Sequence, residues 1–351
     1  MPNTVQKEPT GHRRRSRGVG MAATFAAVTL LAAACGGGAA APAAPAEPNA
    51  PAAPQDAITA VTAQTQTCPS GTPGEGSAPI ALGTKNFAEQ FVLGQLYRQA
   101  LESRGYTVDY RPNIGGSEVI DEAFQAGEID MYPEYLGEIE TSLAGLEVGE
   151  TPEATFAAAK RFEETEREAT ILPQTPFQNT DVLIVKPGFA QEFGLETVPD
   201  LAKVGPAGEG VTLAAQPPFE TRFNGLAGMK EVYGLTAVAF NGVDVGLTYQ
   251  ALDQDIVNVA DAFSTDGQLS TGEYVTLDDP ENIFGFQHVA PVITQAALGE
   301  QGPEFAETLN CVSTLLTTEV MQALNAEVQL NGADPATVAE AFLSANEVLA
   351  Q

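Results

Sequence analysis

From Ile80 to the end of the chain, short apolar runs of strand length alternate with longer segments of helical pattern, in two successive blocks. Strands are expected over residues 80–83, 107–110, 129–132, 182–185, 211–214 and 257–260. Helices are expected over residues 87–104, 117–126, 152–168, 219–233, 245–252, 303–325 and 335–349. Because strand–helix alternation builds parallel sheets covered by helices, the pattern predicts an α/β protein of two lobes, each a parallel-rich sheet flanked by helices.

The two blocks also predict how the chain is divided. Lobe 1 is expected to comprise residues 78–178 plus 289–351, because the tail after Val289 returns to the first block, and lobe 2 residues 179–288. A chain of 351 residues, 44% of them hydrophobic, is long enough to bury two cores. Ligands of open α/β sheets bind beyond the carboxyl ends of the strands, so we expect the site between the lobes.

The charge and the histidine content exclude several functions. The chain has 46 Asp and Glu against 16 Lys and Arg, a net charge of -30, whereas a nucleic-acid partner requires a basic surface. Only His12 and His288 are present, and no G-x-S-x-G, H-E-x-x-H or Walker sequence occurs. We therefore expect no enzyme and no cofactor. Without a C-x-x-C pair, and with His288 alone after the leader, no metal site is expected.

The N-terminus has the features of an export signal. Residues 1–34 carry five basic residues and one acid, a local charge of +4, and end in an apolar stretch from Met21 to Ala34. These fourteen residues span about 21 Å as a helix, short of the ~30 Å hydrocarbon core, so a signal peptide fits better than an anchor. The stretch ends in Leu-Leu-Ala-Ala-Ala-Cys35, which resembles the lipobox of bacterial lipoproteins, with an Ala at the place of the usual Leu.

Cys35 is therefore expected to carry a lipid that anchors the protein to the outer face of the bacterial cytoplasmic membrane. The alternative is ordinary cleavage after an Ala-x-Ala site, which would leave Cys35 as a free thiol. Residues 35–77 are mostly Ala, Pro, Gly, Thr and Gln, and we expect a flexible linker. The other two cysteines, Cys68 and Cys311, are expected to form a disulfide in an exported compartment, with two unpaired thiols as the alternative.

Six segments in order resemble the substrate-binding lipoproteins of ABC importers for glycine betaine, choline and related osmoprotectants. They begin with Gly-Thr-Lys85-Asn-Phe-Ala-Glu-Gln and include Gly-Glu-Ile-Asp-Met-Tyr-Pro-Glu-Tyr135-Leu-Gly and Ala-Phe263-Ser-Thr-Asp-Gly. The others are Asn179-Thr180, Phe-Glu-Thr-Arg222 and Ala290-Pro-Val-Ile. The resemblance covers residues 80–351. It implies a type II periplasmic-binding-protein-like fold whose two lobes close on a solute and deliver it to a membrane permease with its ATPase.

The resemblance also implies the roles of individual residues. In such relatives a box of aromatic rings holds a quaternary ammonium, because a trimethylammonium has no N–H to donate and prefers ring faces, and basic groups hold a carboxylate. Lys85 and Arg222 match the basic groups, Tyr135 matches one ring, and Phe263 stands where another ring is usual. Two further rings are replaced by Asp181 and Gln287, and Glu138 stands where a Thr would help to hold the carboxylate.

Because of these departures we do not expect a complete four-ring box. Asp181 can still neutralise a cation and would accept hydrogen bonds from N–H donors. We therefore expect a cationic or zwitterionic small solute, with glycine betaine as the leading family-level candidate. Two alternatives to a transport component stay open. One is a lipid-anchored sensor ectodomain, which sequence does not separate from a transporter subunit, and the other is a secreted hydrolase on the same scaffold.

Overall fold

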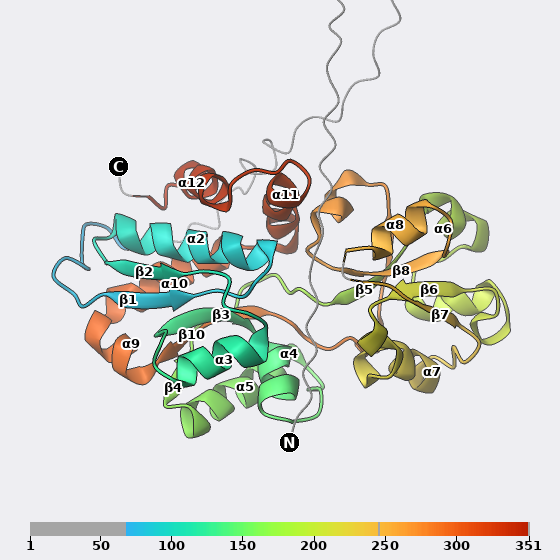
Figure 1. Cartoon of the computed structure of the whole chain (residues 1–351), viewed down its shortest axis with the longest axis horizontal. Coiled ribbons are helices and arrows are strands. Elements are labelled where there is room, and N and C mark those ends of the chain that lie inside the picture. Colours follow the sequence, from blue (N-terminus) through green and yellow to red (C-terminus); the bar gives the residue numbers. More distant parts are fainter. Residues whose placement is uncertain (1–67, 245, 350–351) are drawn as a thin grey trace, which may run out of the picture. The chain divides into compact units, whose positions relative to one another are not determined.

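A computed structural model describes residues 68–244 and 246–349 of the chain. The expected signal peptide, Cys35 and most of the expected linker lie outside the described residues. The described residues contain two five-stranded sheets, each with its own helices (Figure 1).

The first sheet has the strand order β2-β1-β3-β10-β4. Its strands are β1 (Ile80–Gly83), β2 (Val108–Arg111), β3 (Met131–Tyr135), β4 (Ala169–Ile171) and β10 (Val289–Thr294). β1 pairs in parallel with β2 and β3, whereas β10 is antiparallel to both β3 and β4.

Helices bury both faces of the first sheet, and alternate side chains of each strand enter opposite cores. Met131 and Tyr135 of β3 lie in one core, and Tyr132 lies in the other. The first core is closed by α2 (Ala88–Ser103), α10 (Pro303–Leu315), α11 (Thr318–Gln329) and α12 (Pro335–Ala345). The second is closed by α3 (Ser117–Gln125), α4 (Leu136–Glu138) and α5 (Pro152–Glu166), while α9 (Gln295–Gln301) follows β10.

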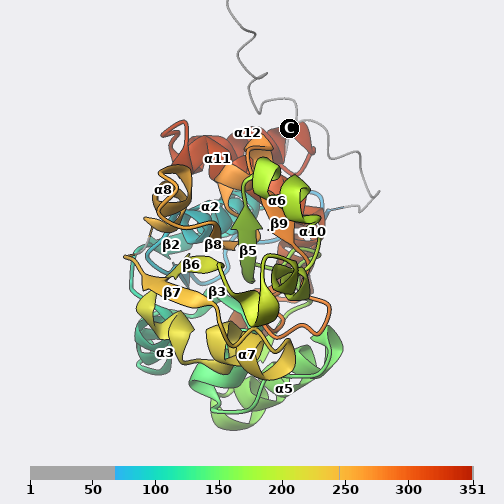
Figure 2. The ribbon, with the colours of Figure 1, turned by 90° about the vertical axis from the view of Figure 1, so that its right-hand side faces the viewer.

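The second sheet repeats this design with the order β7-β6-β8-β5-β9. Its strands are β5 (Asp181–Val185), β6 (Thr212–Ala215), β7 (Ala239–Gly242), β8 (Val259–Phe263) and β9 (Val275–Leu277). The helices are α6 (Pro187–Phe193), α7 (Gly228–Val232) and α8 (Thr248–Asp253). Ala190 of α6 packs in the core of one face and Leu252 of α8 in the core of the other, so the two helices flank the sheet (Figure 2).

The expected fold class is confirmed, but each sheet has two parallel and two antiparallel pairings rather than a mainly parallel set. The antiparallel pairings belong to β10 and β5, the strands by which the chain enters each sheet from the other. A helix crossover within one sheet returns the chain to the same end and makes the next strand parallel. A connection that arrives from another sheet has no such constraint. The residue limits of the two lobes remain a prediction.

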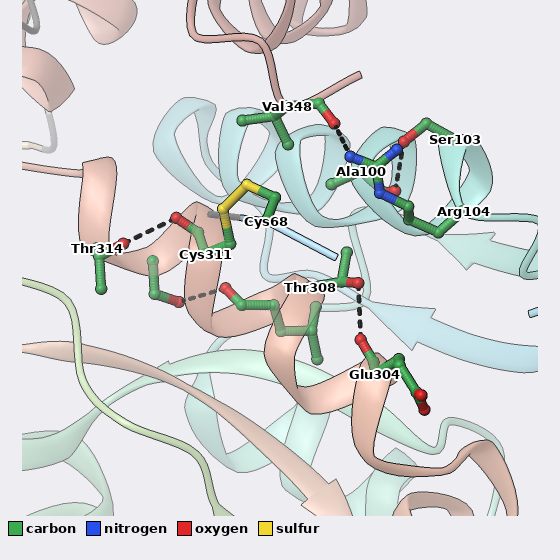
Figure 3. The surroundings of a disulfide bond; sticks show 11 residues. Cys68, Ala100, Ser103, Arg104, Glu304, Thr308, Cys311, Thr314 and Val348 are labelled. Carbon is green, nitrogen blue, oxygen red and sulfur yellow. Dashed lines mark hydrogen bonds between the residues drawn. A yellow bond between two sulfur atoms is a disulfide. The ribbon is translucent and has the colours of Figure 1, made fainter. Parts of the chain in front are cut away.

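The expected disulfide is present: Cys68 is bonded to Cys311 of α10, with their Cα atoms 5.4 Å apart (Figure 3). Residues 68–77 were expected to be linker, yet Gly74 donates its backbone N–H to the carbonyl of Arg104 (2.9 Å). Its Cα lies against Tyr106, so that a side chain at this position would clash. This part of the expected linker is therefore bonded to and packed against the folded body.

Two expected helices are interrupted. The helix expected over 303–325 divides into α10 and α11, because the Thr317 side chain accepts a hydrogen bond from the Val320 N–H and caps a new helix. Of the helix expected over 219–233, only Gly228–Val232 forms as α7, and residues 219–227 form short turns before it, with Asn224 and Gly225 in non-helical conformations. The expected site residue Arg222 lies in this irregular stretch.

Candidate functional site

Four of the expected site residues follow the carboxyl ends of parallel-paired strands. Lys85 and Tyr135 lie at the ends of β1 and β3 in the first sheet, and Arg222 and Phe263 follow or end β6 and β8 in the second. This is the edge at which open α/β sheets bind ligands.

Lys85 is 4% exposed, so a solvated surface lysine, the ordinary role of this residue type, is excluded. Its ammonium forms an ion pair with Glu134 of β3 and donates a hydrogen bond to Ser117 Oγ (3.0 Å). Glu134 is fully buried, and burial raises the pKa of its carboxyl while Lys85 opposes the shift. The lysine charge is thus already compensated by a carboxylate of the protein.

Tyr135 is held beneath this ion pair. Its hydroxyl donates a hydrogen bond to Glu89 Oε1 (2.6 Å), and Lys85 Nζ lies 4.3 Å from the centre of its ring. Burial raises the pKa of this phenol well above its ordinary value, and the Glu89 carboxylate raises it further. Because the ring is 4% exposed and one face is covered by an ammonium, Tyr135 offers little free surface to a cation.

Phe87 is the exposed ring of this group, and the sequence analysis did not select it. It stacks on Tyr135 with ring centres 6.1 Å apart and is 39% exposed. A signal was available, because Phe87 stands two residues after Lys85 within the Gly-Thr-Lys-Asn-Phe segment, at the start of α2.

Asp181 and Arg222 form the second ion pair of the site. Arg222 Nη2 lies 2.6 Å from Asp181 Oδ2, and the aspartate is 8% exposed. Burial raises the pKa of the Asp181 carboxyl above its ordinary value, even though the guanidinium opposes the shift. Asp181 stands at the first position of β5, directly across from Phe263 in the β5–β8 register.

Asp261 is a further residue that the sequence analysis missed. It lies two residues before Phe263 in β8 and is 4% exposed. Burial raises the pKa of this carboxyl well above its usual range, and the neighbouring Asp181 adds to the shift. Ionising both buried carboxyls beside one guanidinium would cost free energy, because their negative charges repel each other. Asp181 and Asp261 together are therefore expected to retain one proton near neutral pH.

Of the remaining expected residues, Phe263 is an exposed ring and Gln287 contacts Glu138. Phe263 is 38% exposed, while Gln287 Oε1 accepts a hydrogen bond from the Glu138 backbone N–H (3.2 Å). The Glu138 charge contributes, as a small addition to burial, to the raised pKa values of both Glu134 and Asp181. Glu138 is therefore within electrostatic reach of both ion pairs. His288 is structural, since its Nδ1 lies 3.0 Å from the carbonyls of Thr175 and Phe177.

Over residues 68–244 and 246–349, no three or more His, Cys, Asp or Glu residues are arranged to hold a metal ion. No helix in the same ranges is both long and apolar enough to cross a membrane.

Comparison with known proteins assigns the chain to a family. Residues 78–345 match the OpuAC family, the substrate binding domain of the ABC-type glycine betaine transport system. The chain belongs to the OpuAC family. The family relation confirms the resemblance found in the sequence, and with it the role of a substrate-binding protein of an ABC transport system.

Relatives and solved structures agree with this membership. The glycine-betaine-binding protein of Pseudomonas aeruginosa is 31% identical over 278 residues, which cover 77% of this chain and 88% of that protein. The glycine betaine-binding protein YehZ of Escherichia coli is 28% identical over 77% of this chain and 92% of its own. The crystal structure of a glycine betaine/carnitine/choline ABC transporter protein has a TM-score of 0.71 and 26% identity, covering 77% of this chain and 99% of that one.

Proposed function

We propose that this OpuAC-family chain holds a small zwitterionic or cationic solute between the Lys85–Tyr135 group and the Asp181–Arg222 group, outside the cell. Relatives that are named for glycine betaine make it the first candidate. The solute-bound form would be recognised by a membrane permease and its ATPase, because a ligand that touches both groups favours the closed state.

The Asp181–Arg222 ion pair is the single observation that carries the proposal. The Asp181 carboxylate binds the guanidinium as the carboxylate of a ligand would, and Arg222 Nε has no hydrogen-bond partner within the described residues. A zwitterion can exchange partners with this pair: its carboxylate takes Arg222 and its cationic end takes Asp181. Such an exchange keeps every charge compensated, which a buried site requires.

The two exposed rings support the cationic end of the solute. Phe87 and Phe263 are each more than one-third exposed and stand beside Lys85 and Asp181, respectively. A cation over such a ring gains about 0.5–2 kcal/mol. Lys85 and Tyr135 support Phe87 from beneath, and Glu138 with Gln287 completes the polar boundary.

Calorimetric titration with glycine betaine, choline, carnitine and basic amino acids tests the proposal. Heat is expected from at least one zwitterion, with a weaker or absent signal from choline, which has no carboxylate to exchange with Asp181. If none of these solutes gives heat, the proposed ligand class is wrong. If choline binds most tightly, the partner exchange is wrong.

The attachment to the membrane belongs to the same proposal. The lipobox-like sequence at Cys35 and the basic, apolar leader before it support export and lipidation. The described body would then be held at the outer face of the cytoplasmic membrane, where its permease lies.

A further inference from the structure

Glu89 is a buried carboxylate that the sequence motif contains but to which no role has been given. It lies in the first turn of α2 and is 2% exposed. Within the described residues no lysine or arginine lies within ion-pair distance of it. A buried carboxylate without a cation is costly unless several donors satisfy it.

Three neutral donors satisfy Glu89, and they come from three different parts of the fold. Oε1 accepts from the Tyr135 hydroxyl (2.6 Å) and from Asn179 Nδ2 (3.0 Å). Oε2 accepts from Asn325 Nδ2 of α11 (2.8 Å). The carboxylate is therefore bonded at once to the proposed solute site, to the chain between the sheets and to the C-terminal helices.

Asn179 lies where the chain passes between the two sheets. It belongs to the outgoing connection, residues 172–180 between β4 and β5. Its backbone N–H donates to the carbonyl of Gln287 (3.0 Å), which belongs to the returning connection, residues 278–288 between β9 and β10. A side-chain bond to Asn179 thus restrains both connections.

Asn325 extends the contact into the second sheet. The same Nδ2 that donates to Glu89 also donates to the carbonyl of Thr265, just after β8 (2.8 Å). The neighbouring Ser264 is bonded to the outgoing connection through both its N–H, which donates to the Thr180 carbonyl (2.9 Å), and its Oγ, which accepts from the Thr180 N–H (3.0 Å).

We infer that Glu89 is a positioning residue that couples the solute site to the two connections, so that the ring stack at Phe87 and Tyr135 and the path between the sheets are held by one carboxylate. The link to solute binding rests on the proposed function. Charge matters here because a carboxylate only accepts hydrogen bonds, and each bond to it is strengthened by the charge. A glutamine replaces one of the two acceptor oxygens with an NH2 group that can only donate, so it cannot accept hydrogen bonds from two asparagine amides and a hydroxyl at once.

Hydrogen exchange of the backbone amides of Asn179, Thr180 and Ser264 tests the coupling without any solute. Each of these amides donates a hydrogen bond at the connections. Glu89→Gln and the milder Tyr135→Phe are each expected to raise their exchange rates about tenfold or more, the size expected for losing a bond to a charged group. Unchanged rates in both variants would overturn the inference.

Glu140→Gln is the matched control. Glu140 is also buried (3% exposed) and accepts from two neutral donors, the Gly149 N–H (3.0 Å) and Thr155 Oγ1 (3.1 Å), neither of which lies in a connection. It is expected to leave the three amides unchanged. An equal rise in Glu140→Gln would show a general loss of stability and would also overturn the inference.

Titration with glycine betaine and L-carnitine then measures the effect on binding. Glu89→Gln is expected to weaken the binding of a solute that the unaltered protein binds by about tenfold. Unchanged affinity would overturn the coupling to the solute site. Absence of heat with the unaltered protein would instead count against the proposed ligand class. In that case the amide exchange rates of Asn179, Thr180 and Ser264 in Tyr135→Phe still test the role of Glu89.

Discussion

Arg222 Nη2 lies 2.6 Å from Asp181 Oδ2, at a position where the aspartate is buried and the arginine side chain is 39% exposed. The arginine thus reaches outward from a fixed internal partner. If a solute exchanges with this pair, Asp181→Asn should weaken the binding of zwitterions with N–H donors at least about tenfold, since a charged hydrogen bond is lost. Competition calorimetry with basic amino acids and glycine betaine measures the change.

Asp181→Tyr provides the converse variant. A ring at this position adds a face for a quaternary ammonium, so the affinity for choline should rise relative to that for basic amino acids. Loss of affinity for both solute types to the same extent would contradict the assignment of Asp181 to the cationic end.

Phe87→Ala should reduce the affinity for a cationic or zwitterionic solute by roughly threefold to thirtyfold, the range of one cation–ring contact. Because the ring is 39% exposed, the thermal midpoint should change little. Leu330→Ala, at another exposed apolar residue (45%), is the control and should leave affinity unchanged. Parallel losses in both variants would argue against a direct contact of Phe87 with the solute.

The buried carboxyl of Glu163 should make the stability of the fold depend on pH. This α5 carboxyl is fully buried, with no hydrogen-bond partner for either oxygen among the described residues. Burial raises its pKa to about 8, with Asp121 and Glu134 adding to the shift and Arg167 opposing it. Between about pH 5 and pH 8, Glu163 is therefore protonated in the folded protein but ionised in the unfolded chain. Because the folded state binds the extra proton, the free energy of unfolding should fall as the pH rises through this range.

The expected slope is about 1.4 kcal/mol per pH unit for this one proton. Glu163→Gln mimics the protonated form and should flatten the slope, with its largest stabilisation near pH 8. Urea unfolding at pH 5 and pH 8 measures both values. The exposed Glu166→Gln on the same helix should keep the slope of the unaltered protein, and an unchanged slope in Glu163→Gln would show that Glu163 is not protonated in the fold.

Reduction of the Cys68–Cys311 disulfide should destabilise the folded body by about 2–5 kcal/mol, because the bond closes a loop across 243 residues of sequence. Urea unfolding with and without a phosphine reductant measures the loss. Neither cysteine belongs to the proposed solute site, so solute affinity at low urea should be preserved. A fall in affinity that precedes any unfolding would contradict this separation.

Cys35→Ala should move the mature protein from the membrane fraction, where detergent is needed to extract it, to the soluble fraction. The prediction follows from the lipobox-like sequence before Cys35. Cys311→Ala, which breaks the disulfide with Cys68 but leaves the leader and Cys35 intact, should leave the protein in the membrane fraction. Retention of Cys35→Ala in that fraction would show that another feature anchors the chain.

The sequence predicts the regular parts of the fold well. The strand expected over 80–83 coincides with β1, and the helix expected over 87–104 differs from α2 by one residue at each end. β4, β7, β9 and β10 were not expected: β4 and β9 have only three residues, β7 ends in Asn-Gly, and β10 contains Pro291, a residue type that disrupts strand pairing. Pro291 is paired in register with Pro133 of β3, so both prolines sit where tertiary pairing overrides local preference.

The site was predicted less completely than the fold. Motif comparison selected Arg222 and Asp181, and the structure brings them together, although nothing in the sequence pairs one with the other. It could not select Asp261 or Glu89, because their roles come from burial and from partners up to 236 residues away. The sequence also indicated Tyr135 rather than Phe87 as a ring that contacts the solute. In the structure Phe87 is the solvent-exposed ring of the two, and Tyr135 is buried.

The crosslink between Cys68 and the middle of α10 also determines how mechanical force would enter the protein. A pull transmitted along the residues before Cys68 enters the folded body through the sulfur atoms into α10 as well as along the backbone toward Ile80. The crosslink thus gives the tension a second covalent path besides the one through β1, the strand that precedes Lys85. In a protein held by that end, part of the load would reach α10 without passing along the strand that leads to the proposed solute site.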